Sequence, residues 1–295
     1  SAPSIGTGFD GPGNGMTNFT VRYAPPDTNS AVGLTQIVTT VNVGFAVQDK
    51  SGNLLLGPLA TNTVFSGFGG ACATNNDGDA VVRYDRLADR WVLTQFSVSS
   101  TPYYECVAVS KTSDATGQWY RYAFQFSDFP DYPKLAVWPD AYYITYNMFL
   151  NGSSWLGGKV CAMDRAKMLV GAAATQICYG LSTSYGGLLA GDVDSTTPPP
   201  DGAPNPIIAL GVAWNDLAAW KFKPDFVTPA NSVFSGPTTL TIPTYTWACN
   251  GGNCVPQSGT TNVLDALSDR LMYRYAYRNF GDHQALVVTH AVKVN

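Results

Sequence analysis

The chain has 295 residues, enough for one large all-β domain or two ordinary ones, and only 13% of them are charged. Its net charge of −4 and pI near 5.0 argue against a nucleic-acid partner, which requires a basic surface. No window approaches the roughly 20 consecutive apolar residues that a helical membrane span needs.

The cysteine content indicates an oxidising compartment. Six cysteines occur in a chain whose surface is rich in Asn, Thr, Ser, Gly and Tyr, which is typical of disulfide-bonded secreted proteins. None lies in a CxxC pair and only two histidines are present, so the pattern does not favour a zinc site. The opening "SAPSIGTG" is typical of a mature N-terminus after signal cleavage. The sequence therefore predicts a secreted, extracellular protein.

A similar unit recurs along the chain, with short β-prone runs separated by turns rich in Gly, Pro and Ser. Its period is about 55 residues, and Cys106 and Cys161 occupy equivalent strands 55 positions apart. Four such runs per unit, without helical periodicity, predict an all-β fold: a β-propeller of five four-stranded blades in a single domain, residues 1–295. A β-sandwich or two small barrels are the alternatives. The expected blades cover residues 24–72, 73–128, 129–184, 185–245 and 260–295, the last closed by a strand from residues 17–23.

This topology also suggests how the cysteines pair. Cys72 and Cys106 fall in neighbouring loops at one end of the blades, Cys161 and Cys178 lie on adjacent antiparallel strands, and "CNGGNC" closes a small loop. The expected bridges are Cys72–Cys106, Cys161–Cys178 and Cys249–Cys254, although six cysteines allow 15 pairings.

Carboxylates and aromatic rings are expected together at that same end of the blades. Aspartates precede most first strands, and the loop "STPYYEC" adds the only glutamate of the chain, Glu105. Sugars stack on aromatic rings, and paired carboxylates supply acid and base for glycan chemistry. An aspartate before a strand is also ordinary turn chemistry. The candidate catalytic residues are Asp27, Asp79, Glu105 and Asp131, and the candidate substrate-binding residues are Tyr103, Tyr104 and Trp155.

Two D-x-D pairs suggest a calcium site. "TNNDGDAVV" contains Asp77 and Asp79, and "AGDVDSTT" contains Asp192 and Asp194. Hard carboxylate ligands one residue apart suit Ca²⁺, although neither segment matches an EF-hand loop and plain Asx-turns explain the same letters.

Two family resemblances rest on these residues. "SKTSDATGQWYRY", through Ser113, Asp114, Gly117 and Trp119, resembles a degenerate Asp-box, the structural turn of sialidase-type propellers, and implies a propeller. The expected blade count and first-strand aspartates resemble five-bladed arabinanase and invertase propellers, which use two aspartates and one glutamate. That resemblance implies Asp27 or Asp79 as base, Asp131 as the group that tunes the acid, and Glu105 as acid.

The sequence thus predicts a secreted protein that acts on a polysaccharide or glycan at one site at the pore mouth. If it is an enzyme, we expect a glycoside hydrolase or a polysaccharide lyase. The alternative is a lectin-like or extracellular structural propeller without catalysis. Blades that share a pattern but little sequence favour one asymmetric site over repeated lectin sites, whereas the scarcity of Glu and His weakens the case for catalysis.

Overall fold

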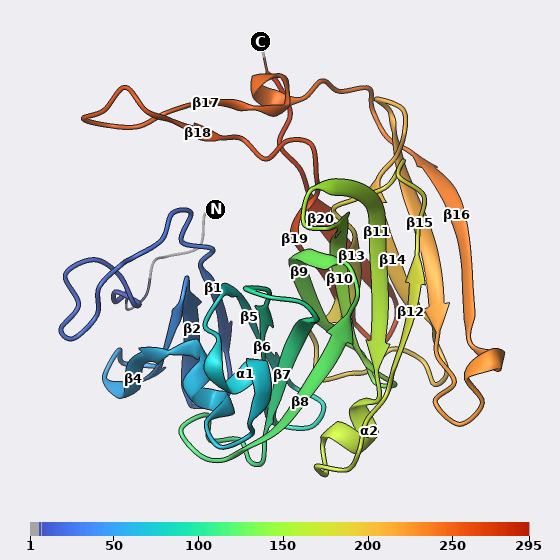
Figure 1. The fold of residues 1–295 in the computed structure, drawn as a ribbon. Helices are drawn as coiled ribbons and strands as arrows, with labels where there is room; N and C mark the ends of the chain where they lie inside the picture. The colour runs from blue at the N-terminus through green and yellow to red at the C-terminus, as the bar shows by residue number, and fades with distance from the viewer. Residues whose placement is uncertain (1–5, 7, 295) are drawn as a thin grey trace. The chain divides into compact units, whose positions relative to one another are not determined.

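The computed structural model describes residue 6 and residues 8–294, which are all-β apart from short helical turns (Figure 1). These residues group into two compact units. The first unit contains the described residues up to Leu135 together with Arg165–Ala174. The second contains Ala136–Asp164 and the described residues from Thr175 onward. The boundary falls within one strand, so we describe each unit separately.

The first unit contains two four-stranded antiparallel sheets whose strands follow chain order. The first sheet, blue in Figure 1, consists of β1 (Asn29–Val32), β2 (Gln36–Val41), β3 (Gly44–Asp49) and β4 (Leu54–Ala60). The second sheet consists of β5 (Gly78–Asp85), β6 (Arg90–Ser97), β7 (Tyr103–Ser110) and β8 (Trp119–Phe126). Between them lie the 3-10 helix η1 (Thr61–Phe65) and helix α1 (Gly70–Thr74). Tight turns join successive strands, as antiparallel hairpins permit.

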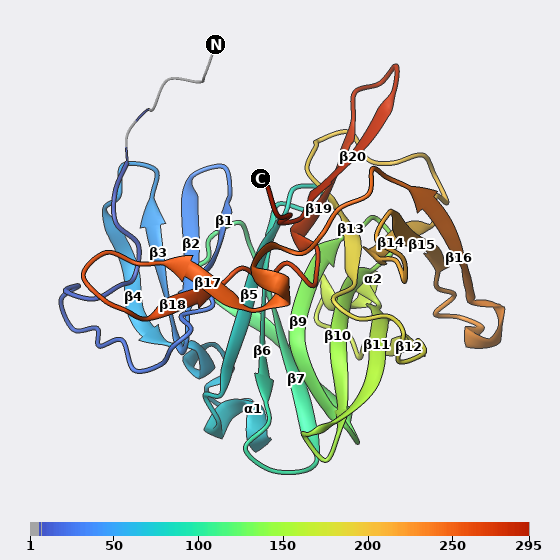
Figure 2. The same cartoon turned by 90° about the horizontal axis from the view of Figure 1, so that it is seen from above.

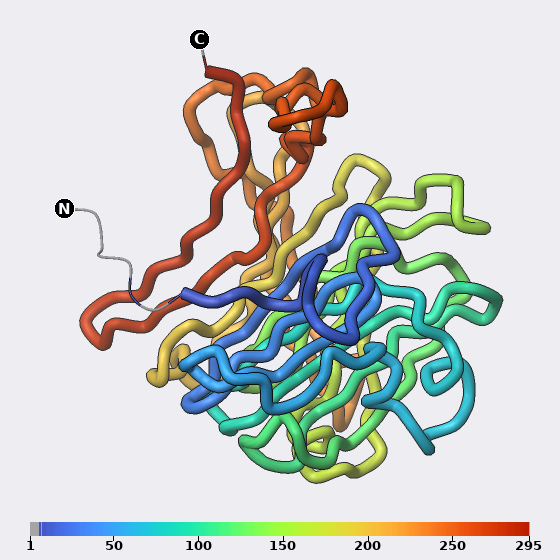
Figure 3. Tube along the Cα trace, turned by 90° about the vertical axis from the view of Figure 1, so that its left-hand side faces the viewer, coloured from blue at the N-terminus to red at the C-terminus, as the bar shows by residue number. Residues whose placement is uncertain are grey.

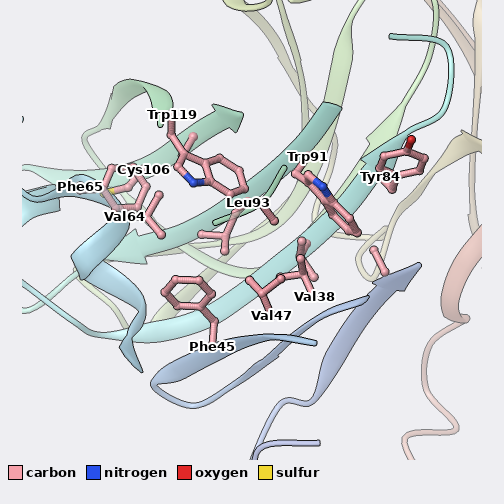
Figure 4. Close-up of a cluster of buried hydrophobic side chains, with 14 of the residues drawn as sticks. Val38, Phe45, Val47, Val64, Phe65, Tyr84, Trp91, Leu93, Cys106 and Trp119 are labelled. Atoms are coloured by element: carbon pink, nitrogen blue, oxygen red, sulfur yellow. The ribbon is translucent and has the colours of Figure 1, made fainter. Parts of the chain in front are cut away.

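A hydrophobic core fills the space between these two sheets (Figure 4). Phe45 and Val47 are two residues apart on β3 and therefore point to the same face, and so do Trp91 and Leu93 on β6. All four side chains are at most 2% exposed. The apolar residues at every second position of these strands are therefore the residues that form this core. Strands β6 and β7 are buried on both faces, and this burial includes polar residues such as Thr94, Gln95 and Glu105.

The turn between β7 and β8 carries the Asp-box-like residues. The Asp114 carboxylate accepts hydrogen bonds from the Thr116 amide (2.9 Å) and from the Gln36 side chain (2.7 Å). The Trp91 indole N–H donates to the Ser113 carbonyl at 2.9 Å, and Trp119 packs into the core. This segment is thus a structural turn that fastens the second sheet to the first.

A short helical segment completes the first unit. Helix α2 (Arg165–Met168) ends with Met168 fully buried. The Arg165 guanidinium binds the buried Asp85 carboxylate through two hydrogen bonds, of 2.7 and 3.1 Å. The Tyr122 hydroxyl donates to the Met168 and Ala172 carbonyls. None of the helices in the described residues has the length and apolar character that crossing a membrane requires.

The third and fourth sheets contain the strands from β9 onward, except β17 and β18. The third sheet has the order β12-β11-β10-β9, and only the end of β9 belongs to the second unit. Its strands are β9 (Phe129–Val137), β10 (Tyr142–Leu150), β11 (Ser154–Met163) and β12 (Gln176–Gly180). The fourth sheet has the order β16-β15-β14-β13-β19-β20. Its strands are β13 (Leu189–Val193), β14 (Asn205–Leu210), β15 (Asp216–Lys223), β16 (Val233–Thr241), β19 (Met272–Asn279) and β20 (Gln284–Thr289).

Several smaller elements connect these strands in the second unit. The 3-10 helices are η2 (Pro229–Asn231) and η3 (Ala248–Gly251). Strands β17 (Asn253–Pro256) and β18 (Val263–Asp265) form a separate two-stranded hairpin, drawn in orange in Figure 2. A core of Leu189, Ile208, Leu210, Leu271 and Tyr275 joins β13 and β14 to the C-terminal strands.

The last strands differ from the expected fifth blade. Strand β19 pairs in parallel with β13, and β20 returns beside β19 as the red hairpin in Figure 3. Residues 17–23 form no strand and pair with neither of them. The prolines at positions 25 and 26 follow that segment after Ala24, and they lack the N–H that a ladder requires. The expected closing strand is therefore absent, and the C-terminal strands extend the fourth sheet.

The six cysteines form three disulfides with the pairing expected from the sequence. Cys72–Cys106 connects α1 to β7 within the core of the first unit. Cys161–Cys178 joins residues that are directly opposite on β11 and β12. Cys249–Cys254 closes a loop at the start of β17. Three disulfides fit a protein of an oxidising, extracellular compartment.

Candidate functional site

The four candidate catalytic residues form one group in the first unit, which we call the acidic centre: Asp27, Asp79, Glu105 and Asp131. Asp79 is the second residue of β5, Glu105 lies on β7, Asp131 lies on β9 and Asp27 precedes β1. The charges of Asp27 and Asp131 both act on Asp79, and the charge of Asp79 acts on Glu105. The fold therefore brings together residues that are up to 104 positions apart, Asp27 and Asp131 being the most distant pair.

The side chain of Asn42, in the turn between β2 and β3, holds two members of this centre. Its Oδ1 accepts a hydrogen bond from the Asp79 amide at 2.9 Å, and its Nδ2 donates to Asp27 Oδ2 at 2.6 Å. Both aspartates have left-handed backbones, with φ of 43° for Asp27 and 48° for Asp79. A Cβ at Gly78 would lie 2.7 Å from Asn42 Oδ1, so the close contact between the backbone at position 78 and the Asn42 side chain requires glycine. The sequence did not single out Asn42, because an asparagine in a turn has an ordinary explanation.

The Asp79 carboxyl is a much weaker acid than an ordinary aspartate. Burial, the neighbouring charge of Asp27 and a hydrogen bond with the Asp27 carboxyl raise the pKa of Asp79 to about 7. The positive charge of Lys134 acts in the opposite direction, and Asp131 adds a smaller increase. A carboxyl group with this pKa is substantially protonated near neutral pH and can donate its proton.

Glu105 lies deeper than the other members of the centre. Its side chain is 0% exposed, and neither carboxylate oxygen has a hydrogen-bond partner of good geometry. Burial, and then the charge of Asp79, raises the pKa of Glu105 well above its usual range, opposed by the nearby Thr94 hydroxyl and by Lys134. A group without exposed surface cannot touch a substrate in this conformation. With its raised pKa, the Glu105 carboxyl is instead a second protonated group in the acidic centre.

Lys134 on β9 is a second residue that the sequence did not single out. Its ammonium lies 3.4 Å from the centre of the Tyr132 ring and donates to the Pro133 carbonyl at 3.0 Å. Its charge lowers the pKa of both Asp79 and Glu105. No motif marks this lysine, because its role depends on which strands lie beside β9.

The candidate aromatic residues separate into different environments. The Tyr103 ring packs edge-on against Phe129, with centroids 5.6 Å apart. Because side chains two apart in a strand share a face, Tyr103 accompanies Glu105 on β7 and Phe129 accompanies Asp131 on β9. Tyr104 points the other way and packs against the hydrophobic core. Trp155 belongs to the second unit, where its indole N–H donates to the Thr183 carbonyl at 2.8 Å.

The D-x-D pairs have other partners than a metal ion. The Asp77 carboxylate accepts hydrogen bonds from the Val98 and Ser99 amides. Asp192 and Asp194 bind one guanidinium, that of Arg274, at 3.0 and 2.8 Å. Within residues 6 and 8–294 no group of three or more His, Cys, Asp or Glu residues is arranged to hold a metal. Asp77, Asp192 and Asp194 are thus engaged by groups of the protein itself, and the calcium site stays a prediction.

Comparison with known proteins yields one distant likeness. No model of a protein family and no curated protein matches the chain. Among solved structures it is similar to a GH43 endo-arabinanase from Bacillus licheniformis, with 12% sequence identity and a TM-score of 0.36. The likeness covers 90% of this chain and 92% of that one. At this TM-score the likeness carries no argument about the chemistry of the acidic centre, which depends on the residues of the chain itself.

Proposed function

We propose that the acidic centre of the first unit hydrolyses glycosidic bonds by acid–base catalysis. The observation that carries this proposal is the pKa of about 7 at Asp79, a partly exposed carboxyl with further carboxyl groups beside it. Hydrolysis of a glycoside needs one protonated carboxyl and one carboxylate on the two sides of the scissile bond. The Tyr103–Phe129 pair, on the same strand faces as Glu105 and Asp131, offers apolar ring surface to a sugar.

The roles follow from the environment of each group. Asp79 donates its proton to the glycosidic oxygen as the bond from that oxygen to the anomeric carbon breaks. A water molecule forms the new bond to that carbon, and Asp131 accepts the proton that the water loses. Asp27 shares a hydrogen bond with Asp79 and is therefore too close to it to act from the opposite side of the sugar. Burial and the neighbouring Asp27 keep the pKa of Asp79 high.

A paired screen tests this proposal. The purified chain is incubated with plant, fungal and algal polysaccharides, and both new reducing ends and the absorbance of unsaturated uronates are measured. We expect reducing ends without unsaturated uronates, and a loss of about 100-fold or more in Asp79→Asn and Asp131→Asn. Asp128→Asn is the matched control, because Asp128 lies in the same unit and is not one of the charged groups that raise the pKa of Asp79.

Three outcomes would count against the proposal. Unsaturated uronates would indicate a lyase. Full activity in Asp79→Asn would place the chemistry elsewhere. Retention on a polysaccharide without turnover would indicate a binding protein of the lectin-like kind.

A further inference from the structure

The second unit contains a cavity of about 640 Å³ that is separate from the residues of the acidic centre. Its walls come from β10 and β11, from the loop at residues 183–187, from the turn after β14, and from segments at residues 245–247 and 269–270. Cavities of about 300–1,000 Å³ are the size of small-ligand sites. We call this cavity the aromatic pocket, after the five rings that line it: Phe149, Trp155, Trp214, Tyr245 and Trp247.

The rings of the aromatic pocket form two groups. The Trp214 ring lies 5.0 Å from Trp247 and 6.2 Å from Tyr245, and Phe149 lies 5.4 Å from Trp155. Trp214 is nevertheless 50% exposed. A large aromatic side chain that lines a cavity and keeps half of its surface in water leaves apolar area for a ligand to cover.

Two of the rings pack closely against neighbouring glycines. A Cβ at Gly186 would lie 2.7 Å from the Trp155 ring, and a Cβ at Gly251 would lie 2.8 Å from the Trp247 ring. The hydrogen bond from the Trp155 indole to the Thr183 carbonyl adds a polar anchor. The pocket is thus formed before a ligand arrives, which reduces the entropy cost of binding.

The charges in the pocket neutralise one another. Asp269 and Arg270 both line it, and the guanidinium donates two hydrogen bonds of 2.8 Å to the Asp269 carboxylate. An anionic ligand would compete with Asp269 for this guanidinium, and a quaternary ammonium ligand would need a carboxylate that is not already paired. The remaining polar groups are uncharged, among them Asn147 and Ser184. Flat apolar rings can stack on the C–H face of a neutral sugar, and the uncharged polar groups beside them can hydrogen-bond to its hydroxyl groups.

We propose that the aromatic pocket binds a neutral oligosaccharide, with Trp214 as the ring on which a sugar unit stacks. This site requires none of the residues of the acidic centre, so it can exist whether or not that centre is catalytic. In a hydrolase it would retain the polysaccharide, and in the absence of catalysis it would be the principal function of the chain.

The test is calorimetric titration of the full chain with hexasaccharides of glucose (β-1,4), xylose, mannose and arabinose. We expect at least one of them to bind. Trp214→Ala should weaken that binding about tenfold, the loss expected for one stacked aromatic ring. Gly186→Ala should weaken it independently, because the added Cβ displaces Trp155. If Trp214→Ala does not fold, Gly186→Ala decides the test alone.

Two controls separate sugar binding in the aromatic pocket from hydrolysis at the acidic centre. Phe280→Ala removes a ring of the second unit that is 53% exposed and lies outside the pocket, and it should bind normally. Asp79→Asn should also bind normally, even where it abolishes hydrolysis. The proposal is overturned if none of the four hexasaccharides binds, if Trp214→Ala and Gly186→Ala bind as the wild type does, or if oligogalacturonate binds more tightly than the neutral sugars.

Discussion

Asp79 shows how one residue acquires its chemistry from neighbours that are far away in sequence. Asp27 precedes β1 and Asp131 lies on β9, and burial together with these two carboxylates raises the pKa of Asp79 to about 7. The ordinary value for this carboxyl is 3.8. Between these values the folded protein keeps a proton that the unfolded chain has released. The stability that this proton contributes is complete below about pH 4 and is lost as the pH rises through 7.

The pH dependence of unfolding therefore tests the state of Asp79 without any substrate. We expect the free energy of unfolding of the wild type to fall between about pH 4 and pH 7, by at most about 1.4 kcal/mol per pH unit from this group. Asp79→Asn, which cannot ionise, should show a shallower decline and should be the more stable protein at pH 8. Urea unfolding at a series of pH values measures both. Asp128→Asn should keep the wild-type slope, and an equally steep slope in Asp79→Asn would contradict the assignment.

At the scale of elements, the junction of β13 and β19 depends on one arginine. Arg274 on β19 reaches both Asp192 on β13 and Asp194 just after it, and the side chain of Asp192 is 0% exposed. Asp192 also accepts the Val137 amide at 2.9 Å. A carboxylate buried in this way is costly without its cationic partner. The pair that resembled a calcium motif in the sequence thus joins the C-terminal hairpin to the fourth sheet.

Removing this arginine should destabilise the second unit. We expect Arg274→Ala to lower the free energy of unfolding by about 3 kcal/mol, because it leaves a buried carboxylate without its counter-charge. Adding Asp192→Asn to Arg274→Ala should restore part of that loss, since the carboxylate is then gone. Arg278→Ala, an exposed arginine on the same strand, should change stability by less than about 0.5 kcal/mol. Equal effects of the two arginine variants in urea unfolding would disprove the role of the junction.

At the scale of the whole molecule, the chain does not divide into its two units at a single cut. It leaves the first unit after Leu135, returns to it for Arg165–Ala174, and then leaves again. The returning segment carries Arg165, the partner of the buried Asp85, and Met168, which is fully buried. Each unit is therefore assembled from two separate segments of the chain.

A fragment of residues 1–135 should consequently be unstable on its own. Without the returning segment, Asp85 loses its arginine and the Met168 site is empty. We expect rapid cleavage of this fragment in limited proteolysis, and increased resistance after addition of a peptide with the sequence of residues 164–174. The same peptide with Arg165→Ala should protect less. A fragment 1–135 that resists protease without any peptide would show that the returning segment is dispensable.

The amino-acid sequence by itself determined the local features of this protein. Alternating apolar residues, as in Phe45 and Val47, define the strands, because side chains of a strand alternate between two faces. Turns rich in Gly, Pro and Ser separate those strands, since such residues favour the backbone conformations of tight turns. The cysteine pairs also followed from strand order, because bridged residues must lie on neighbouring segments. The aspartates of the acidic centre could be named because they precede or begin strands.

Tertiary structure decided what depends on contacts between distant segments. Only the fold shows that Asn42 fixes Asp27 and Asp79, that Lys134 lowers the pKa of Asp79, and that Glu105 is fully buried. The prediction of a closing strand at residues 17–23 was wrong, because the edge of β13 pairs with β19 instead. The rings of the aromatic pocket come from separate loops, and no sequence pattern records that these loops converge on one cavity.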